Sequence, residues 1–213
     1  TKLVHGAWLP LLIAIGAFTI MTTWQRGRVL VTDARREAEG PMREFIEGLS
    51  TREPPLVRLP GTAVFLNRGD DTAPLSMRAN VEHNHVLAEH VVIISLHILP
   101  VPRVPDSDRI SVDDLGVPDD GIIHVKAAFG YMERTDVPHA LSLVDPAQTE
   151  GPLDLDRATY FLSRLELCQG DAPTMAPWRK GLFIATSYLT ADAAAHFGLP
   201  LDRTVLIGSR LQV

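Results

Sequence analysis

The chain has 213 residues, a formal net charge of −6 and a sequence pI of about 5.7. This length suits one ordinary domain plus a short additional segment. The acidic balance argues against a nucleic-acid partner, which normally requires a basic face. The single cysteine, Cys168, excludes a disulfide within the chain and suits a reducing compartment. Because the chain starts at Thr1 rather than Met, we expect further sequence upstream.

The first segment has the composition of a membrane span. Residues 3–24, LVHGAWLPLLIAIGAFTIMTTW, contain no Asp, Glu, Lys or Arg. A helix needs roughly 20 apolar residues to cross a bilayer core. Trp8 and Trp24 lie toward the two ends, where aromatic belts occur. We therefore predict a last transmembrane helix over residues 1–25.

The charges that follow this segment predict its orientation. Arg26, Arg28, Arg35 and Arg36 lie directly downstream, and cytoplasmic flanks are enriched in such residues. We therefore expect the rest of the chain to be cytoplasmic, at a cell inner membrane. Two alternatives are weaker. A secretory signal peptide has a shorter apolar region and a cleavage site of small residues, which TTWQRGR does not offer. A buried helix of a soluble core does not suit a terminal segment followed by a strongly polar stretch.

Residues 26–56 are predicted to connect the span to a domain. Apolar residues recur at three- and four-residue steps through residue 49, which indicates an amphipathic helix. Gly40 and Pro41 are expected to break or kink it. The sequence TREPPL at residues 51–56 is typical of a stiff linker.

Residues 57–213 alternate short β-rich runs with helical patterns, which predicts a cytosolic C-terminal α/β domain with a mixed β-sheet. The apolar run VVIISLHI is typical of a central strand. We expect the strands near residues 109–112 and 121–129 to form the antiparallel part. The expected strands cover residues 62–66, 91–98, 109–112, 121–129, 159–167 and 204–213, and the expected helices residues 74–84, 137–144 and 177–197.

Four residues receive a structural interpretation. Trp178 and Phe183, both in the last predicted helix, are expected to pack in the hydrophobic core rather than to bind a ligand. Gly61 is expected at a strand end and Gly130 at a strand bulge, two positions where a missing side chain accommodates the backbone.

No catalytic motif is present: the sequence has no phosphate-binding GxxxxGK[ST], no GxGxxG after a strand and no GxSxG. The best cluster for a metal is Glu82, His83, Asn84, His85, Glu89 and His90. Metal ligands must converge on one point, and on a helix His85 and Glu89 share a face whereas His83 and His85 do not. A helix end whose side chains cap and pack is therefore favoured over a metal site.

A second acidic run, Asp113, Asp114, Asp119 and Asp120, lacks the spacing of a calcium-binding loop. We interpret it as a solvated turn. The sequence thus predicts no catalytic, cofactor-binding or metal-binding residue in this chain, and no enzyme activity.

Several blocks of sequence occur in an order that is specific, although no single block is. They are FTIMTTWQRGR, LPGTAVFL, HNHVLAEHVV, VPRVPDSDRI, FGYMERTDVPHAL, TYFLSRLEL and MAPWRKGLF. In sequence and order they resemble one family, the Kup-type (KUP/HAK/KT) potassium uptake permeases. The resemblance covers essentially the whole chain, and HNHVLAEHVV departs from the family pattern at Ala88 and His90.

The resemblance implies the C-terminal part of a low-affinity K⁺ uptake transporter, with K⁺ coupled to H⁺ in the full-length protein. In such transporters ions bind near the bilayer midplane, in membrane helices that this chain does not contain. We therefore transfer no ion-binding residue and expect the chain alone not to transport. The expected partners are the lipid bilayer and the missing N-terminal transmembrane region, and a homodimer is a further candidate.

Two other functions remain open on the sequence. One is a free-standing, membrane-anchored module that binds a ligand such as a nucleotide at the strand ends of its sheet. The other is a membrane-anchored hydrolase that uses the region around residues 83–90, although no nucleophile or metal set accompanies it.

Overall fold

The computed structural model describes residues 8–168, 175–187 and 197–212. The chain divides into two compact units. Unit 1 comprises Thr1–Glu37, Leu165–Ala191 and Arg210–Val213, and unit 2 comprises Ala38–Arg164 and Asp192–Ser209. The domain limits predicted from the sequence, after residues 25 and 56, stay a prediction.

Helix α1, Trp8–Glu39, is a single unbroken helix that is long and apolar enough to cross a membrane. Only 6% of its most apolar window is buried, so most of the apolar side chains in that window are exposed in the described part of the chain. The helical spacing predicted from residue 26 is confirmed as far as Glu39, since residues 26–39 continue α1 without a break. The predicted break is confirmed: Gly40 has a φ of +62°, and α2, Met42–Glu47, starts after Pro41.

Within unit 1, helix α5, Pro177–Ser187, packs on α1. The Phe183 ring meets the Trp24 ring edge-on, with centroids 5.4 Å apart. Arg179 Nε donates to Thr23 Oγ1 over 3.0 Å. Phe183 is buried as expected, but Trp178 is 60% exposed, so the expectation that Trp178 belongs to the core is wrong. The rest of the predicted helix, residues 188–196, lies outside the described residues.

The six-stranded sheet has the order β3-β4-β2-β1-β5-β6. Strands β2 and β5 run parallel to β1, β4 runs parallel to β2, and β3 runs antiparallel to β4. The predicted mixed sheet and its antiparallel pair are therefore confirmed. The strands are β1 (Val57–Asn67), β2 (Val86–Leu99), β3 (Ile110–Asp113), β4 (Ile122–Gly130), β5 (Thr159–Cys168) and β6 (Thr204–Gln212). β1 and β2 are longer than expected, because parallel strands extend beyond their apolar centres by main-chain pairing.

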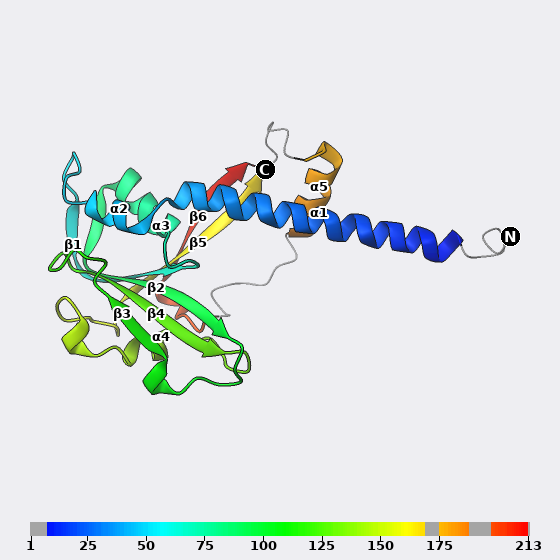
Figure 1. The fold of residues 1–213 in the computed structure, drawn as a ribbon. Helices are drawn as coiled ribbons and strands as arrows, with labels where there is room; N and C mark the ends of the chain where they lie inside the picture. Colours follow the sequence, from blue (N-terminus) through cyan, green and yellow to red (C-terminus); the bar gives the residue numbers. More distant parts are fainter. Residues whose placement is uncertain (1–7, 169–174, 188–196, 213) are drawn as a thin grey trace. The chain divides into compact units, whose positions relative to one another are not determined.

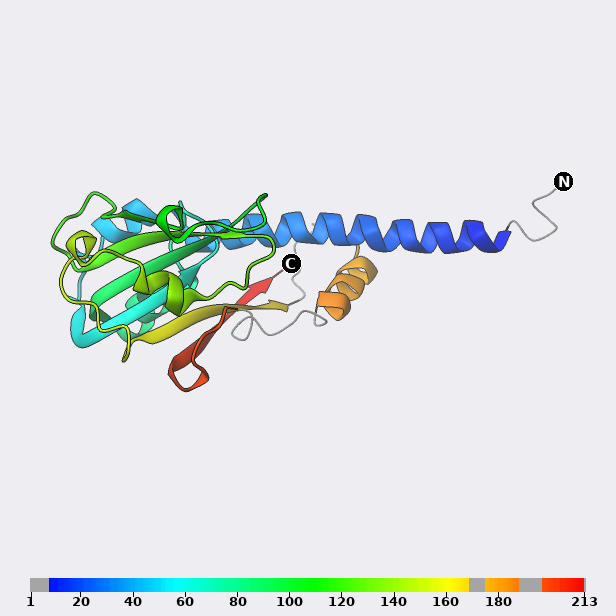
Figure 2. The same cartoon turned by 90° about the horizontal axis from the view of Figure 1, so that it is seen from below.

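Short helices cover both faces of the central strands (Figure 1). On one face α4, Val137–Ser142, buries Val137, Ala140 and Leu141 against the sheet. On the other, Met42 and Ile46 of α2 pack with Met77 of α3, Leu75–Ala79. Figure 2 shows strands β1, β2 and β4 side by side from below. The remaining short turns are η2 (Asn80–Asn84), η3 (Asp106–Asp108), η4 (Pro146–Gln148) and η5 (Leu201–Arg203).

Gly61 and Gly130 each occupy the kind of position that was expected for the other. Gly61, with a φ of +114°, lies where the β1–β2 register shifts between Leu59 and Thr62, so it marks the bulge. Gly130 ends β4, where an added Cβ would collide with the carbonyl oxygen of Pro102. Gly130 is therefore required by a close backbone approach rather than by a bulge.

Candidate functional site

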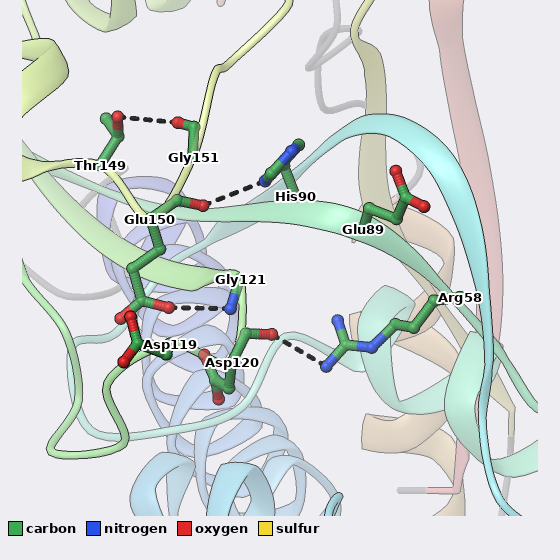
Figure 3. A pocket seen from close by; sticks show the side chains of 9 residues that line it. All are labelled: Arg58, Glu89, His90, Asp119, Asp120, Gly121, Thr149, Glu150 and Gly151. Carbon is green, nitrogen blue, oxygen red and sulfur yellow. Dashed lines mark hydrogen bonds between the residues drawn. The ribbon is translucent and has the colours of Figure 1, made fainter.

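An open pocket of about 570 Å³ lies at the amino ends of the parallel strands (Figure 3). Arg58 comes from the start of β1, Glu89 and His90 from the start of β2, and Gly121 directly precedes β4. The loop after η4 closes the opposite side with Thr149, Glu150 and Gly151. We call this the amino-end pocket.

Hydrogen bonds hold the walls of the amino-end pocket together. Arg58 donates to the carbonyl oxygens of Ala88 and Asp120, each over 3.0 Å. The Gly121 N–H donates to Glu150 Oε2 over 2.8 Å, and His90 Nδ1 lies 3.1 Å from the Glu150 carbonyl oxygen (Figure 3). The Arg58 side chain therefore joins the beginnings of strands β1 and β2 to the turn before β4.

The pocket contains more negative than positive charge, with Glu89, Asp119, Asp120 and Glu150 around Arg58. Burial raises the pKa of Asp120, and the neighbouring Glu150 raises it further by its charge and a side-chain hydrogen bond. The charged form of the Asp120 carboxyl is therefore disfavoured in the folded protein. Among the described residues, no three His, Cys, Asp or Glu side chains are grouped to hold a metal ion.

We expect Asp120→Asn to raise the melting temperature of the chain at pH 7 by about 1–3 °C. Because the pKa of Asp120 is higher in the folded than in the unfolded protein, the charged carboxylate lowers the stability of the fold at pH values above the folded pKa. Below the unfolded pKa of 3.8 the carboxyl is protonated in both states, and this loss of stability disappears. The gain should therefore vanish near pH 3.5. Thermal unfolding in detergent at both pH values checks this.

Asp119→Asn is the matched control for Asp120→Asn. Asp119 has a φ of +65°, which asparagine tolerates, and its side chain is exposed. Equal changes in melting temperature for both variants would contradict burial of the Asp120 carboxyl as the cause. So would an increase in the melting temperature of Asp120→Asn that persists at low pH.

A second polar group lies on the face of the sheet that α2 and α3 cover. Along the strands this face is apolar at Phe65 and Ile93, then becomes polar. Asn67 pairs with Ser95, and Ser95 pairs with Lys126. We call the polar set the polar cluster; it consists of Asn67, Asp70, Ser95, His97, His124 and Lys126.

The centre of the polar cluster is a buried pair. The Ser95 hydroxyl donates to the Gly69 carbonyl oxygen over 2.8 Å, so the Nε2–H of His124 donates to Ser95 Oγ over 2.9 Å. His124 is 1% exposed. Burial lowers the pKa of His124, which keeps the ring neutral near pH 7 and suits a donor to a hydroxyl.

Asp70 forms the outer part of the polar cluster. Its Oδ1 lies 2.8 Å from His97 Nε2 and its Oδ2 lies 3.7 Å from Lys126 Nζ. Burial alone would raise the pKa of Asp70, but the hydrogen bond from His97 and the charges of His97 and Lys126 bring it below its usual value. Asp70 therefore binds the loop after β1 to strands β2 and β4.

The same loop holds the end of α1. Thr72 Oγ1 donates to Glu39 Oε2 over 2.6 Å, and the Met42 N–H donates to the Asp71 carbonyl oxygen over 2.8 Å. Arg78 Nη1 donates to the Glu39 carbonyl oxygen over 2.8 Å. The loop from Gly69 to Ala73 thus connects the last turn of α1 with the polar cluster, entirely within unit 2.

The residues considered for a metal do not come together as a helical set. His85 ends the π-helical turn η2 with a left-handed φ of 55°, whereas Glu89 and His90 lie on β2. The expectation that His85 and Glu89 share a helix face is therefore wrong. Glu82 pairs instead with Arg78 over 2.8 Å. Asn84 bonds Asn80, as expected of a side chain at a helix end.

The acidic run behaves as the turn that the sequence predicted. Asp113, Asp114 and Asp120 each accept a backbone N–H two residues onward. The polar cluster, in contrast, was missed. Its only signal in the sequence is the pair of polar residues Ser95 and His97, two positions apart within an apolar strand, which indicates one polar face.

Comparison with known families decides what kind of chain this is. The profile of the K⁺ potassium transporter C-terminal domain matches residues 60–213. The chain belongs to this potassium transporter family. The resemblance predicted from the sequence is thereby confirmed, and the matching profile and relatives are named as potassium transport proteins.

Individual relatives agree with the family. The chain is 66% identical over its full length to a protein of Rhodococcus jostii (strain RHA1) named "Probable potassium transport system protein Kup". It is 39% identical to the Kup protein of Anaeromyxobacter sp. (strain Fw109-5) and 34% identical to that of Bordetella avium (strain 197N). The chain spans about a third of the length of these relatives, 32–33%. No solved structure matches it significantly.

Proposed function

We propose that this chain is the C-terminal part of a potassium uptake permease that couples K⁺ entry to H⁺ entry. In this proposal α1 is the last membrane helix, and the α/β domain is cytosolic and adjusts transport. The observation that supports it best is the 66% identity over all 213 residues to a Kup protein, combined with an apolar helix at the matching end. Arg26 and Arg28 after the apolar segment support the cytosolic side for the domain.

The contacts at the end of α1 support a regulatory role for the domain. Groups that bind the end of a membrane helix can transmit a change between that helix and a domain, because packed contacts and hydrogen bonds carry coupling between sites. Thr72 and Arg78 bind Glu39, and the loop that carries Thr72 is bound to strand β2 at Ser95 and His97. A displacement of the polar cluster would therefore move the groups that hold the helix.

The test is K⁺ uptake in cells that lack their own uptake systems, using the full reading frame that contains this chain. We expect the full-length protein to restore growth at low K⁺ and Thr72→Val to lower its uptake rate about five-fold, the lower range of allosteric coupling. Thr72→Val removes the hydroxyl that binds Glu39 and keeps the shape of the side chain. Acidification of the cell interior on K⁺ addition would report the coupled H⁺.

The matched control is Thr51→Val, because Thr51 is exposed and its hydroxyl bonds only within its own turn. It should leave uptake unchanged, with equal amounts of each protein in the membrane. The 213-residue chain expressed alone should give no uptake. Failure of the full-length protein to carry K⁺ would overturn the transport proposal, and normal uptake by Thr72→Val would overturn the regulatory role.

A nucleotide-binding module has less support. The amino-end pocket is lined by four carboxylates and one guanidinium, a balance that repels phosphate groups. It also lies at the amino ends of the parallel strands, whereas nucleotides in open α/β sheets bind beyond the carboxyl ends.

A further inference from the structure

Strands β2 and β4 end side by side (Figure 1). Exposed apolar side chains lie at and just beyond these strand ends. Each is between 39% and 67% exposed, although all are large and apolar. Scattered apolar residues are ordinary on a protein surface, but a contiguous group of them marks an interaction site. We call this group the apolar tip; it consists of Ile98, Leu99, Val101, Tyr131 and Met132.

The apolar tip is built on a rigid base. Ile98 and Leu99 remain paired with Phe129 and Gly130 of β4. Beyond the strands, the Tyr131 N–H donates to the Val101 carbonyl oxygen over 3.0 Å and the Met132 N–H to that of Pro102 over 3.2 Å. The two chain segments therefore protrude as one preformed unit.

An ion pair between the buried Arg109 and the partly exposed Glu133 stabilises this base. Glu133 accepts the backbone N–H groups of Gly130 and Val104 over 2.6 and 3.1 Å, and it pairs with Arg109 over 2.9 Å. Arg109 in turn donates to the Val104 carbonyl oxygen. Because these bonds connect both segments, exposure of the apolar side chains does not depend on a flexible loop.

Basic side chains flank the apolar tip. Arg103 follows Val101 by two residues, and Arg134 follows Met132 by two residues. Both are exposed, and within the described part of the chain neither has an ion-pair partner. Aliphatic, tyrosine and methionine side chains beside arginines match the interfacial region of a bilayer, where apolar groups insert and arginines bind phosphate.

The chain itself keeps unit 2 close to a membrane if α1 crosses one. Only residues 25–37 lie between the apolar segment and Ala38, the first residue of unit 2. Thirteen helical residues extend about 20 Å, so the lipid surface is present at high effective concentration. A weak affinity of the apolar tip for lipid would therefore be sufficient to keep the tip bound to the membrane surface.

We propose that the apolar tip inserts into the headgroup region of the anionic membrane that α1 crosses, while Arg103 and Arg134 bind lipid phosphates. This inference rests on the proposed role of α1 as a membrane span. Lipid is favoured over a protein partner because five side chains form a surface too small for a standard protein interface, which buries about 800 Å² on each side. A lipid surface requires no matching shape.

Site-directed spin labelling of the full 213-residue chain in vesicles tests the proposal. Single cysteines are placed at Met132, at Leu201 and at Ile15 in a Cys168→Ser background whose thermal unfolding matches that of the natural chain. Leu201 is the matched control, because it is 77% exposed in unit 2 but lies outside the apolar tip. The label at Ile15 reports independently whether α1 enters the bilayer.

In vesicles of phosphatidylcholine with phosphatidylglycerol, the Met132 label should be reached by oxygen more readily than by a water-soluble nickel complex. The Leu201 label should show the reverse, with accessibility ratios that differ by about ten-fold. Arg103→Gln with Arg134→Gln should lower the Met132 ratio to that in phosphatidylcholine alone, because anionic lipid attracts exposed arginines.

The outcomes separate this proposal from the proposed function. If the Ile15 label stays in water, the membrane role of α1 is wrong. If the Ile15 label is in lipid but the Met132 label matches Leu201, only the insertion of the apolar tip is overturned. A Met132 label that is immobile yet shielded from both oxygen and nickel would indicate a protein neighbour and would equally overturn it.

Discussion

Gly121→Ala is expected to lower the melting temperature of the chain by about 6–12 °C, the equivalent of roughly 3 kcal/mol. Gly121 has a φ of +79°, a conformation that alanine adopts only under strain, and an added Cβ would collide with the Glu89 carbonyl oxygen. The backbone at Gly121 or at Glu89 would have to move to relieve this collision. The movement would also disturb the Gly121 carbonyl, which accepts the Val91 N–H over 2.7 Å, and the N–H bond to Glu150.

Thermal unfolding of the chain in detergent measures this effect. Gly208→Ala is the matched control, because Gly208 also lies in unit 2 and an added Cβ there would meet nothing within 4 Å. This control should leave the melting temperature unchanged or raise it slightly, since alanine reduces the freedom of the unfolded chain. A Gly121→Ala protein as stable as Gly208→Ala would show that the turn before β4 can relax.

Arg109→Met is expected to lower the melting temperature by about 4–10 °C at pH 7. The Arg109 side chain is 8% exposed and bonds Glu133, Asp106 and the Val104 carbonyl oxygen. Methionine keeps an unbranched apolar stem but removes the guanidinium, which lies over the Phe129 ring, and leaves the Glu133 carboxylate without its cation. Arg157→Met, at an exposed position, should change the melting temperature by less than about 2 °C.

The effect of Arg109→Met should depend on pH. The hydrogen bond from Arg109, followed by the Gly130 N–H, lowers the pKa of Glu133 from 4.5 to about 2. A lowered carboxyl pKa contributes stability above the unfolded value of 4.5 and loses it as the pH falls toward 2. The difference between Arg109→Met and the natural chain should therefore be smaller at pH 3 than at pH 7. An equal difference at both values would contradict the ion pair as the cause.

The local sequence was sufficient for most elements of the fold. The continuous apolar run at residues 91–98 has the pattern of a strand buried on both faces, and β2 contains it. Gly40 and Pro41 end a helix by backbone chemistry alone, and α1 ends at Glu39. The apolar length of the first segment identified the helix able to cross a membrane, because that property depends on composition and not on neighbours.

Tertiary contacts decided what the local pattern could not. His85 occupies a left-handed position that ends η2, so the side chains from Glu82 to His90 diverge along a turn and a strand instead of one helix. Trp178 is exposed whereas Phe183, five residues further along α5 and on a different side of the helix, is buried against Trp24. An apolar residue predicts burial only where another element supplies the partner.

The candidate sites likewise depend on residues far apart in the sequence. Ser95 and His124 meet because β2 and β4 pair in parallel register, and Asp120 meets Glu150 because the loop after η4 returns to the amino ends of the strands. The sequence by itself determined the apolar helix and the α/β class, since both follow from composition and local pattern, and its ordered blocks indicated the family by resemblance. Only the tertiary structure placed the polar cluster, the amino-end pocket and the apolar tip, since strand register and loop return bring their members together.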